Sequence, residues 1–355
     1  MYREHTVAIV VPAYNEAGYV GNVIDTIPDY ADRVYVVDDG STDDTWDEIR
    51  RHATARNAAT DSPIGEFVVP IQHEENRGVG GAIKTGYSRA REERIDITAV
   101  LGGDDQMNPA ALTRYLDPIV EGTADYTKGT RFAQPDDWTA MPRFRAVGNV
   151  VLSVLTKIAS GYWGVMDSQN GYSAISLSAL EAIDLDALYE YYGYCNDLLI
   201  RLNTAEMRVA DVAHSAEFTY SDDWKSHIQY SEYIPRVSLM LLRGFARRLT
   251  RKYLLHQYSP IAPLYAIGAT LSGVAGAGFL AALLGRTRDG PGTWLLAFVS
   301  GLTALLGASV LDRTENSHLD HQVDDRTSET PTQRQRRENG DEPPEETAQP
   351  PSSEA

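Results

Sequence analysis

The chain has 355 residues, enough for one sizeable catalytic domain and an appendage. Its 50 acidic residues outnumber the 32 Lys and Arg residues, and the formal net charge is −18. This charge excludes a nucleic-acid binder, because such a protein needs a basic face to neutralise phosphates. An acidic surface of this kind suits high salt, in which the repulsion between like charges is screened. An acidic protein from an organism that lives at ordinary salt concentrations is the alternative. The single cysteine, Cys195, excludes an internal disulfide.

The first 230 residues alternate short β-branched runs with stretches of helical spacing. Strands are predicted at Thr6–Val11, Arg33–Val37, Phe67–Ile71 and Thr98–Leu101. Helices are predicted at Gly18–Ile27 and Asp43–Ala55, with Ser41 or Thr42 as the N-cap of the second. The alternation predicts a parallel α/β sheet with right-handed crossovers. Ligands of such sheets bind at the carboxyl ends of the strands.

Basic and apolar residues interleave between about Pro235 and Tyr258. The basic residues are Arg236, Arg243, Arg247, Arg248, Arg251 and Lys252. Together with the leucines and aromatic residues between them, they predict a basic amphipathic helix over residues 231–258 that lies on an anionic membrane surface. An ordinary solvated helix face is the alternative.

Two uncharged apolar stretches follow, Ile261–Leu284 and Trp294–Leu311. Each reaches the length that crosses a bilayer, so residues 259–312 are expected to form a transmembrane hairpin; a buried hairpin in a soluble core is the alternative. The basic segment before the first span predicts a multi-pass protein of the cell membrane whose catalytic domain is cytoplasmic. Residues 313–355 are strongly polar and are expected to form a disordered acidic tail.

The first two predicted strands each lead into a polar motif. Residues 12–16 read PAYNE and residues 37–43 read VDDGSTD. The adjacent carboxylates Asp38 and Asp39 are expected at the ligand edge of the sheet, where an acidic side chain can accept hydrogen bonds from a base or a ribose. An Asp–Gly turn that caps a helix is the alternative.

Two further motifs lie at the next strand ends. Residues 76–86 read NRGVGGAIKTG. The Walker spacing is absent, so these glycines are interpreted as allowing close backbone approach where a helix begins. Residues 102–109 read GGDDQMNP directly after an apolar strand. Asp104, Asp105 and Gln106 offer hard oxygen ligands, which predicts a Mg²⁺ or Mn²⁺ site shared with substrate phosphates. An acidic loop without an ion is the alternative.

In this order the four motifs resemble family-2 glycosyltransferases of the GT-A fold, and within them the dolichyl-phosphate mannose synthase and polyprenyl-phosphate sugar transferase group. The similarity runs from about Thr6 to Tyr258, and a trailing pair of membrane helices fits the same group. The resemblance implies a nucleotide-diphospho-sugar transferase domain over residues 1–230, with a mostly parallel sheet. Combined with the acidic composition, it implies a haloarchaeal source.

The resemblance also implies roles for individual residues. The donor-binding residues are Pro12, Tyr14, Glu16, Asp38, Asp39, Arg131 and Arg145, of which the two arginines bind phosphates. The metal ligands are Asp104 and Gln106. Asp167 and Gln169 lie in the acceptor-side segment 167–172 (DSQNGY), and Asp197 is the candidate general base. In the usual metal-binding signature, Asp-x-Asp, the first position is occupied here by Gly102. Asp105 or Gln106 is therefore expected to bind the metal together with Asp104.

The implied reaction is an inverting transfer of a hexose from a nucleotide-sugar to dolichyl phosphate or a dolichol-linked glycan. Its implied pathway is the assembly of glycans that are N-linked to a surface-layer glycoprotein. A polysaccharide precursor is the alternative acceptor, and a non-catalytic membrane scaffold that keeps the transferase fold is the alternative without chemistry. A nucleotidyltransferase needs a glycine-rich loop after the first strand, which PAYNE is not.

Overall fold

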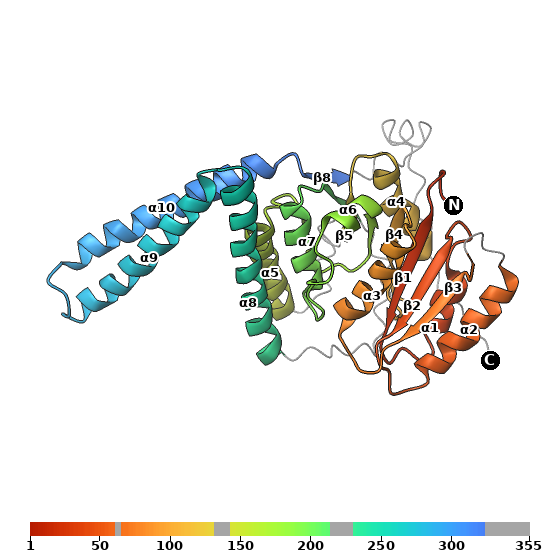
Figure 1. Ribbon diagram of the computed structural model, residues 1–355. Helices are drawn as coiled ribbons and strands as arrows, with labels where there is room; N and C mark the ends of the chain where they lie inside the picture. Colours follow the sequence, from red (N-terminus) through yellow and green to blue (C-terminus); the bar gives the residue numbers. More distant parts are fainter. Residues whose placement is uncertain (61–64, 131–142, 214–229, 324–355) are drawn as a thin grey trace, which may run out of the picture.

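The computed structural model describes residues 1–60, 65–130, 143–213 and 230–323 (Figure 1). Within these ranges the strands form one sheet in the order β3-β2-β1-β4-β6-β5-β7-β8. The strands are β1 (Val7–Ala13), β2 (Arg33–Asp38), β3 (Val68–Gln72), β4 (Ile97–Val100), β5 (Tyr126–Thr130), β6 (Ser173–Ser176), β7 (Val209–Ala213) and β8 (Asp320–Val323). Among them, β6 is antiparallel to both of its neighbours and the other pairs are parallel. The predicted α/β fold with a mostly parallel sheet is confirmed.

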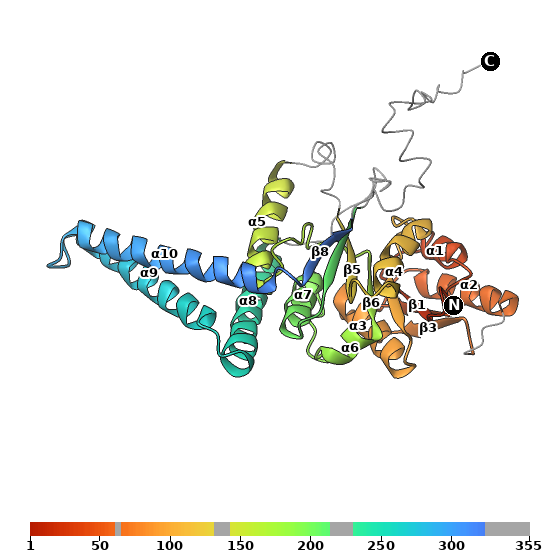
Figure 2. The same ribbon diagram turned by 90° about the horizontal axis from the view of Figure 1, so that it is seen from above.

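Helices cover both faces of the sheet, as Figure 2 shows from above. On one face lie α1 (Val20–Thr26), α2 (Thr45–Ala59), the turn η1 (Pro109–Ala111) and α4 (Leu112–Val120). On the other lie α3 (Val79–Glu92), α6 (Leu177–Ala182) and α7 (Tyr194–Thr204). Alternation along β1 produces the two cores, because Val7, Ile9 and Val11 face the first set while Ala8 and Val10 face the second.

The four predicted strands and both predicted helices are present, with slightly different ends. The N-cap prediction for α2 is wrong, because the residue before this helix is Asp44. The Asp43 carboxylate accepts hydrogen bonds from the backbone N–H and the hydroxyl of Thr45 at 3.0 and 2.5 Å. Ser41 is used elsewhere, since its hydroxyl accepts a hydrogen bond from the backbone N–H of Asn15 at 2.9 Å.

One edge of the sheet collects the motifs. The parallel strands β1, β2, β3 and β4 end there, and β5, which is antiparallel to β6, ends there too. Because β6 runs the other way, the segment 167–172 that precedes it reaches the same edge. A hydrogen bond from the backbone N–H of Gly103 to the carbonyl of Pro12 (3.1 Å) joins two of these strand ends. The topology therefore brings motifs that are far apart in sequence to one place.

The second part of the molecule is helical. It comprises α5 (Arg143–Ser160), α8 (Tyr230–Arg248), the π-helix η3 (Leu249–His256), α9 (Ile261–Leu283) and α10 (Pro291–Asn316). α8 packs on α5 and α7 through Val237, Met240 and Leu241. α9 and α10 form a hairpin that projects away from the catalytic body, with α8 crossing its base (Figure 1).

Both helices of the hairpin are long and apolar enough to cross a membrane. Large apolar side chains point outward from it, with Leu296 70% and Leu306 68% exposed. The two helices pack closely at small residues: a Cβ added to Gly268 would lie 3.0 Å from the carbonyl oxygen of Gly301. A hairpin with a tight interior and an apolar exterior is what a bilayer solvates, whereas a water-soluble protein rarely exposes so large an apolar surface.

The expectation of a disordered tail from residue 313 onward is wrong for residues 313–323. α10 continues to Asn316, and Asp320–Val323 forms β8, which pairs with β7 in the main sheet. The Asp320 carboxylate also accepts a hydrogen bond from the backbone N–H of Gly164 at 2.6 Å. Both ends of the hairpin are thus fastened to the catalytic domain. The rest of the predicted tail, residues 324–355, lies outside the described residues.

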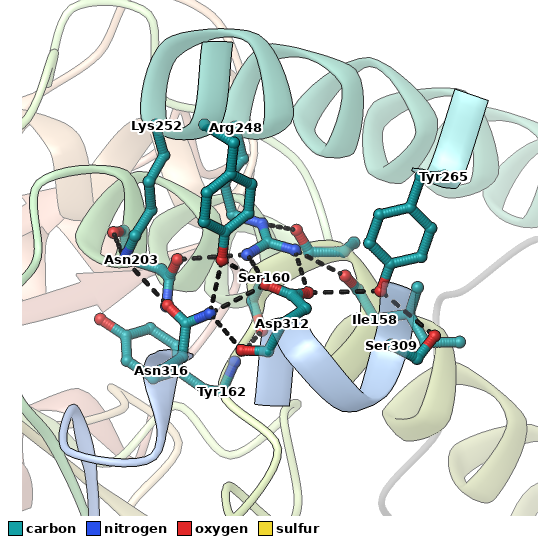
Figure 3. Close-up of polar contacts among 12 residues, drawn as sticks. Ile158, Ser160, Tyr162, Asn203, Arg248, Lys252, Tyr265, Ser309, Asp312 and Asn316 are labelled. Atoms are coloured by element: carbon teal, nitrogen blue, oxygen red, sulfur yellow. Dashed lines mark hydrogen bonds and ion pairs between the residues drawn. The ribbon is translucent and has the colours of Figure 1, made fainter. Parts of the chain in front are cut away.

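The prediction that residues 231–258 present one basic face to a membrane is also wrong in part. Arg248 and Lys252 are buried at the base of the hairpin, in the polar cluster of Figure 3. Arg248 forms a bidentate pair with Asp312, with N–O distances of 2.9 and 2.7 Å. Lys252 donates to the side-chain oxygen of Asn316 at 2.8 Å. Tertiary pairing has therefore removed two cations from the basic face that local spacing predicts.

Candidate functional site

Asp38 ends β2, Asp39 follows it, and both are almost fully buried. Asp38 accepts hydrogen bonds from the Gln72 side chain (3.0 Å) and from the backbone N–H of Ser41 (3.2 Å). Oδ1 of Asp39 accepts from Nδ1 of His73 (2.7 Å) and from the backbone N–H of Arg77 (2.9 Å). Neighbouring strand ends therefore hold both carboxylates at the ligand edge, where the sequence places them.

Glu16 and Asp104 bring two further carboxylates to this edge. Burial, together with the charges of Asp104 and Asp43, raises the pKa of Glu16 to about 7. Burial also raises the pKa of Asp104 above its ordinary range, although the backbone N–H of Gln106 partly offsets this. Burial raises the pKa of Tyr192 as well, and the charges of Glu16 and Asp104 add to that increase. The site holds negative charge that the described residues do not neutralise.

A divalent cation fits this donor set. Glu16 and Asp104 supply carboxylate oxygens, the hard ligands that Mg²⁺ and Mn²⁺ prefer. The described residues contain no group of three or more His, Cys, Asp and Glu side chains that could hold an ion alone. Mg²⁺ commonly uses one or two carboxylates and completes its coordination with substrate phosphates and water, so two carboxylates suffice if the donor supplies the rest.

Gly102 is the first position of the metal motif, and a nearby side chain occupies the space beside it. A Cβ added to Gly102 would lie 2.7 Å from Oδ1 of Asp104, so the Asp104 carboxylate occupies the space beside the glycine. The Asp105 side chain is exposed and points elsewhere, since its Oδ2 accepts a hydrogen bond from the Asn22 amide at 2.6 Å. Glu16, from the PAYNE motif, is therefore better placed than Asp105 to supply the carboxylate that is missing at position 102.

The glycines of residues 76–86 permit close backbone approach at the start of α3, as interpreted from the sequence. Gly78 has φ +85°, and a Cβ added to it would lie 2.7 Å from the carbonyl oxygen of Glu190. The approaching partner is the loop that precedes α7. The Glu190 carboxylate accepts from Arg77 (2.9 Å) and from Lys84 (3.0 Å), which ties this loop to the donor edge.

The acceptor-side segment is held by amide contacts. Asp167 is buried, and the carbonyl of this residue accepts a hydrogen bond from the backbone N–H of Asn170 at 3.1 Å. The Gln169 amide donates to Asn196 on α7 (2.8 Å) and accepts from the Tyr233 hydroxyl on α8 (3.3 Å). The segment therefore joins the sheet edge to both helices of the second part.

Asp197, the candidate general base, is engaged by three hydrogen bonds within the protein. Its side chain is 4% exposed and accepts hydrogen bonds from Arg201 (2.7 Å), from Arg247 (2.9 Å) and from the backbone N–H of Tyr189 (3.1 Å). Two guanidinium groups and an amide thus engage both of its oxygens. Three hydrogen bonds use most of the acceptor capacity of this carboxylate, and through them Asp197 holds α7, α8 and the loop at residue 189 together.

The remaining donor-binding predictions are only partly described. Tyr14 is 43% exposed beside β1, and Pro12 is half-buried at its end. Arg131 follows β5 directly but lies outside the described residues, and the side chain of Arg145, in the first turn of α5, also lies outside them.

The sequence reasoning missed several residues that line or brace this edge. They are His73, Arg77, Glu190 and Tyr192. His73 follows β3 directly, so the rule that polar residues at strand ends bind ligands could have found it. Glu190 and Tyr192 lie in the irregular loop before α7, where no periodic signal marks a residue as close to the sheet edge.

Comparison with known proteins defines the class. Residues 8–184 match the model of glycosyl transferase family 2, and the chain belongs to this family. It is a glycosyltransferase, and its mixed sheet is that of the GT-A fold.

Particular relatives are archaeal. The chain is 31% identical over 215 residues to UDP-N-acetylglucosamine–dolichyl-phosphate N-acetylglucosaminyltransferase of Methanococcus voltae, covering 59% of this chain and 85% of that one. It is 33% identical over 176 residues to glycosyltransferase AglJ of Haloferax volcanii, covering 48% of this chain and 50% of the relative. Among solved structures, glucosyl-3-phosphoglycerate synthase from Mycobacterium tuberculosis is 18% identical with a TM-score of 0.47, over 69% of this chain and 80% of that one.

Proposed function

We propose that this glycosyltransferase moves a hexose from a nucleotide-sugar to a lipid-borne acceptor at the cytoplasmic membrane surface, with dolichyl phosphate as the acceptor. The observation that carries the proposal is the apolar hairpin whose two ends are both fastened to the catalytic domain. That arrangement supports a catalytic domain held close to a bilayer that the hairpin would span. The name of the Methanococcus voltae relative, which specifies dolichyl phosphate, supports the acceptor class.

In the proposed donor site, Asp38 and Asp39 hold the nucleotide together with Pro12 and Tyr14. Glu16 and Asp104 would hold Mg²⁺ or Mn²⁺, with Gln106 as a further candidate ligand. Such an ion supplies charge neutralisation for the departing nucleoside diphosphate. We also propose Arg131 and Arg145 as partners of the donor phosphates, for which their planar donor geometry is suited.

We propose a direct displacement with inversion. An acceptor oxygen attacks the anomeric carbon as the bond to the nucleoside diphosphate breaks. The engagement of Asp197 by two arginines supports a phosphate acceptor, because a phosphate monoester is largely deprotonated near neutrality and needs no general base. Asp167 and Gln169 would border the acceptor.

The domain arrangement follows from the same proposal. Residues 1–230 perform the chemistry, α8 and η3 rest at the interface, and the hairpin spans the bilayer. A 23-residue helix such as α9 covers roughly 34 Å, which matches a hydrocarbon core of about 30 Å. Because the hairpin returns to β8, both of its ends lie on the catalytic side. Assembly of N-linked surface-layer glycans in a halophile is the pathway we propose.

The test uses membranes that contain the full-length protein, labelled nucleotide-sugars and dolichyl phosphate at low and at molar salt. Metal-dependent label in the lipid fraction, lost on chelation and in Asp104→Ala, is the expected result. A lipid fraction without metal-dependent label, across donors, would sink the proposal. Label that appears in a water-soluble polysaccharide instead would favour the alternative acceptor.

A non-catalytic scaffold is the second candidate, and Gly102 at the first metal-motif position favours it. It predicts binding of Mn²⁺ and a nucleoside diphosphate without turnover of any sugar. The same labelled donors, assayed with both lipid and water-soluble acceptors, separate the two.

A further inference from the structure

We propose that a groove between α8 and the loop before α7 binds the phosphate headgroup of an anionic bilayer lipid, as a site separate from the sugar acceptor. This inference rests on the proposed seating at a membrane. The groove has a volume of about 450 Å³ and includes four arginines among its lining residues. They are Arg201, Arg236, Arg243 and Arg247. Asp197 is the one carboxylate of this lining, so the groove is strongly positive in a protein whose net charge is −18.

Arg236 and Arg243 are the two arginines of this lining that can meet a ligand, because Arg201 and Arg247 are both held by Asp197. Arg201 is buried, and its donors are used by Asp197 and by backbone carbonyls. Arg236, Arg243 and Arg247 lie at i, i+7 and i+11 on α8, which places them along one helix face. Arg236 is paired with Glu232 on the exposed surface, where such a pair contributes little. Arg243 is exposed and forms no ion pair within the described part of the chain.

The groove is amphipathic, which identifies the ligand as a lipid. Leu239 lines it and is 46% exposed, and Leu242 on the same helix is 65% exposed. α8 crosses the base of the apolar hairpin (Figure 1), which puts this helix at the level of the proposed bilayer boundary. Guanidinium groups bind phosphate oxygens with paired N–H donors, and the leucines can contact the first methylenes of an acyl chain.

The loop before α7 separates the groove from the transfer site. Tyr191 lines the groove, with the Arg236 guanidinium 5.9 Å from its ring centroid. The preceding residue, Glu190, contacts the donor edge instead: its carbonyl accepts a hydrogen bond from the backbone N–H of Gly81 (2.9 Å), and its carboxylate accepts one from Arg77 (2.9 Å). Adjacent residues of this loop thus contact the groove and the donor edge, so a phosphate held by Arg236 and Arg243 lies across the loop from the donor-edge residues. The bound phosphate therefore anchors the protein and is not the attacking group.

The test measures lipid retention by the full-length protein. Protein is reconstituted in vesicles of equimolar phosphatidylglycerol and phosphatidylcholine, extracted in neutral detergent and gel-filtered, and the retained lipid is identified by mass spectrometry. Wild type is expected to retain phosphatidylglycerol over phosphatidylcholine. Arg236→Gln/Arg243→Gln is expected to reduce this retention about tenfold or more, because hydrogen bonds to charged groups are lost.

The matched control is Arg50→Gln/Arg89→Gln, which removes the same charge from exposed positions on α2 and α3. Equal retention by wild type and the groove variant, or an equal loss in the control, overturns the proposal. A second arm adds polyprenyl phosphate to the vesicles. If it displaces phosphatidylglycerol from wild type, the groove belongs to the acceptor and the separate site is refuted. Sugar transfer, measured in the same vesicles, tests the proposed function independently of retention.

Discussion

Two groups of charges, one fully buried and one partly buried, distinguish the base of the hairpin from the donor edge of the sheet. At the hairpin base, the Arg248 guanidinium donates to Asp312, to Asn203 and to the carbonyls of Ile158 and Ala159, which satisfies all of its N–H groups. At the donor edge, Glu16 and Asp104 lie near each other without a cation from the described residues, and burial raises the pKa of both.

Charges in the two regions therefore have different functions. Charges that the chain neutralises internally fasten parts of the structure together. Carboxylates that are buried beside like charges cost folding free energy, and they are expected where a ligand or an ion completes the balance. Substitutions at the two places should therefore change stability in opposite directions.

The largest effect is expected at the hairpin base. Arg248→Met leaves Asp312 buried without its partner, which should cost about 3–5 kcal/mol of unfolding free energy. The melting temperature in detergent should fall by roughly 10 °C, given about 2–4 °C per kcal/mol. Arg248→Met/Asp312→Leu should regain much of the loss. Arg94→Gln, which breaks an exposed pair with Glu181, is the control and should change little. An Arg248→Met protein as stable as wild type would contradict this assignment.

At the donor edge, Asp104→Asn should lower sugar transfer on the order of 100-fold or more, because a bound metal contributes several kcal/mol to catalysis. Its melting temperature without metal should equal or exceed that of wild type, since the removed carboxylate is buried at a cost. Asp105→Asn is the matched control: its carboxylate is exposed and bonded to Asn22, so transfer should stay within about threefold. A large loss of stability in Asp104→Asn would remove the contrast between the two regions.

The pH dependence of stability should identify Glu16. Its pKa is raised from 4.5 to about 7 in the folded protein. Between these values the native state binds more protons than the unfolded state, so this group makes metal-free stability fall as pH rises through that window. Glu16→Gln should remove the fall, and its melting temperature relative to wild type should increase from pH 4 to pH 8 in chelator. A difference in melting temperature that is constant across pH would show that the pKa of Glu16 is not raised in the folded protein.

The smallest effect is expected for Gly102→Ala. The added Cβ meets the end of the Asp104 side chain rather than backbone, and this side chain can rotate away, so the fold should remain intact. Turning that carboxylate should weaken Mn²⁺ binding about three- to tenfold, as measured by calorimetric titration with a nucleoside diphosphate present. Gly307→Ala, where nothing lies within 4 Å of the new Cβ, is the control. Unchanged Mn²⁺ affinity in Gly102→Ala would separate this glycine from the metal site.

The sequence by itself determined the local elements and the motif edge. Strand and helix periodicity depends on neighbouring residues only, so β1 to β4, the two early helices and both apolar helices could be predicted. Once the strands are parallel, their carboxyl ends must share an edge, which is why Asp38, Asp39 and Asp104 are found there.

Only the tertiary structure decided which charges pair across long distances. Asp312 pairs with Arg248, residues 320–323 join the sheet as β8, and Asp197 pairs with Arg247. Such partners are chosen by packing, and periodicity contains no record of them. A carboxylate in the sequence is the same whether two arginines or a metal will hold it, and the fold alone brings one or the other within reach.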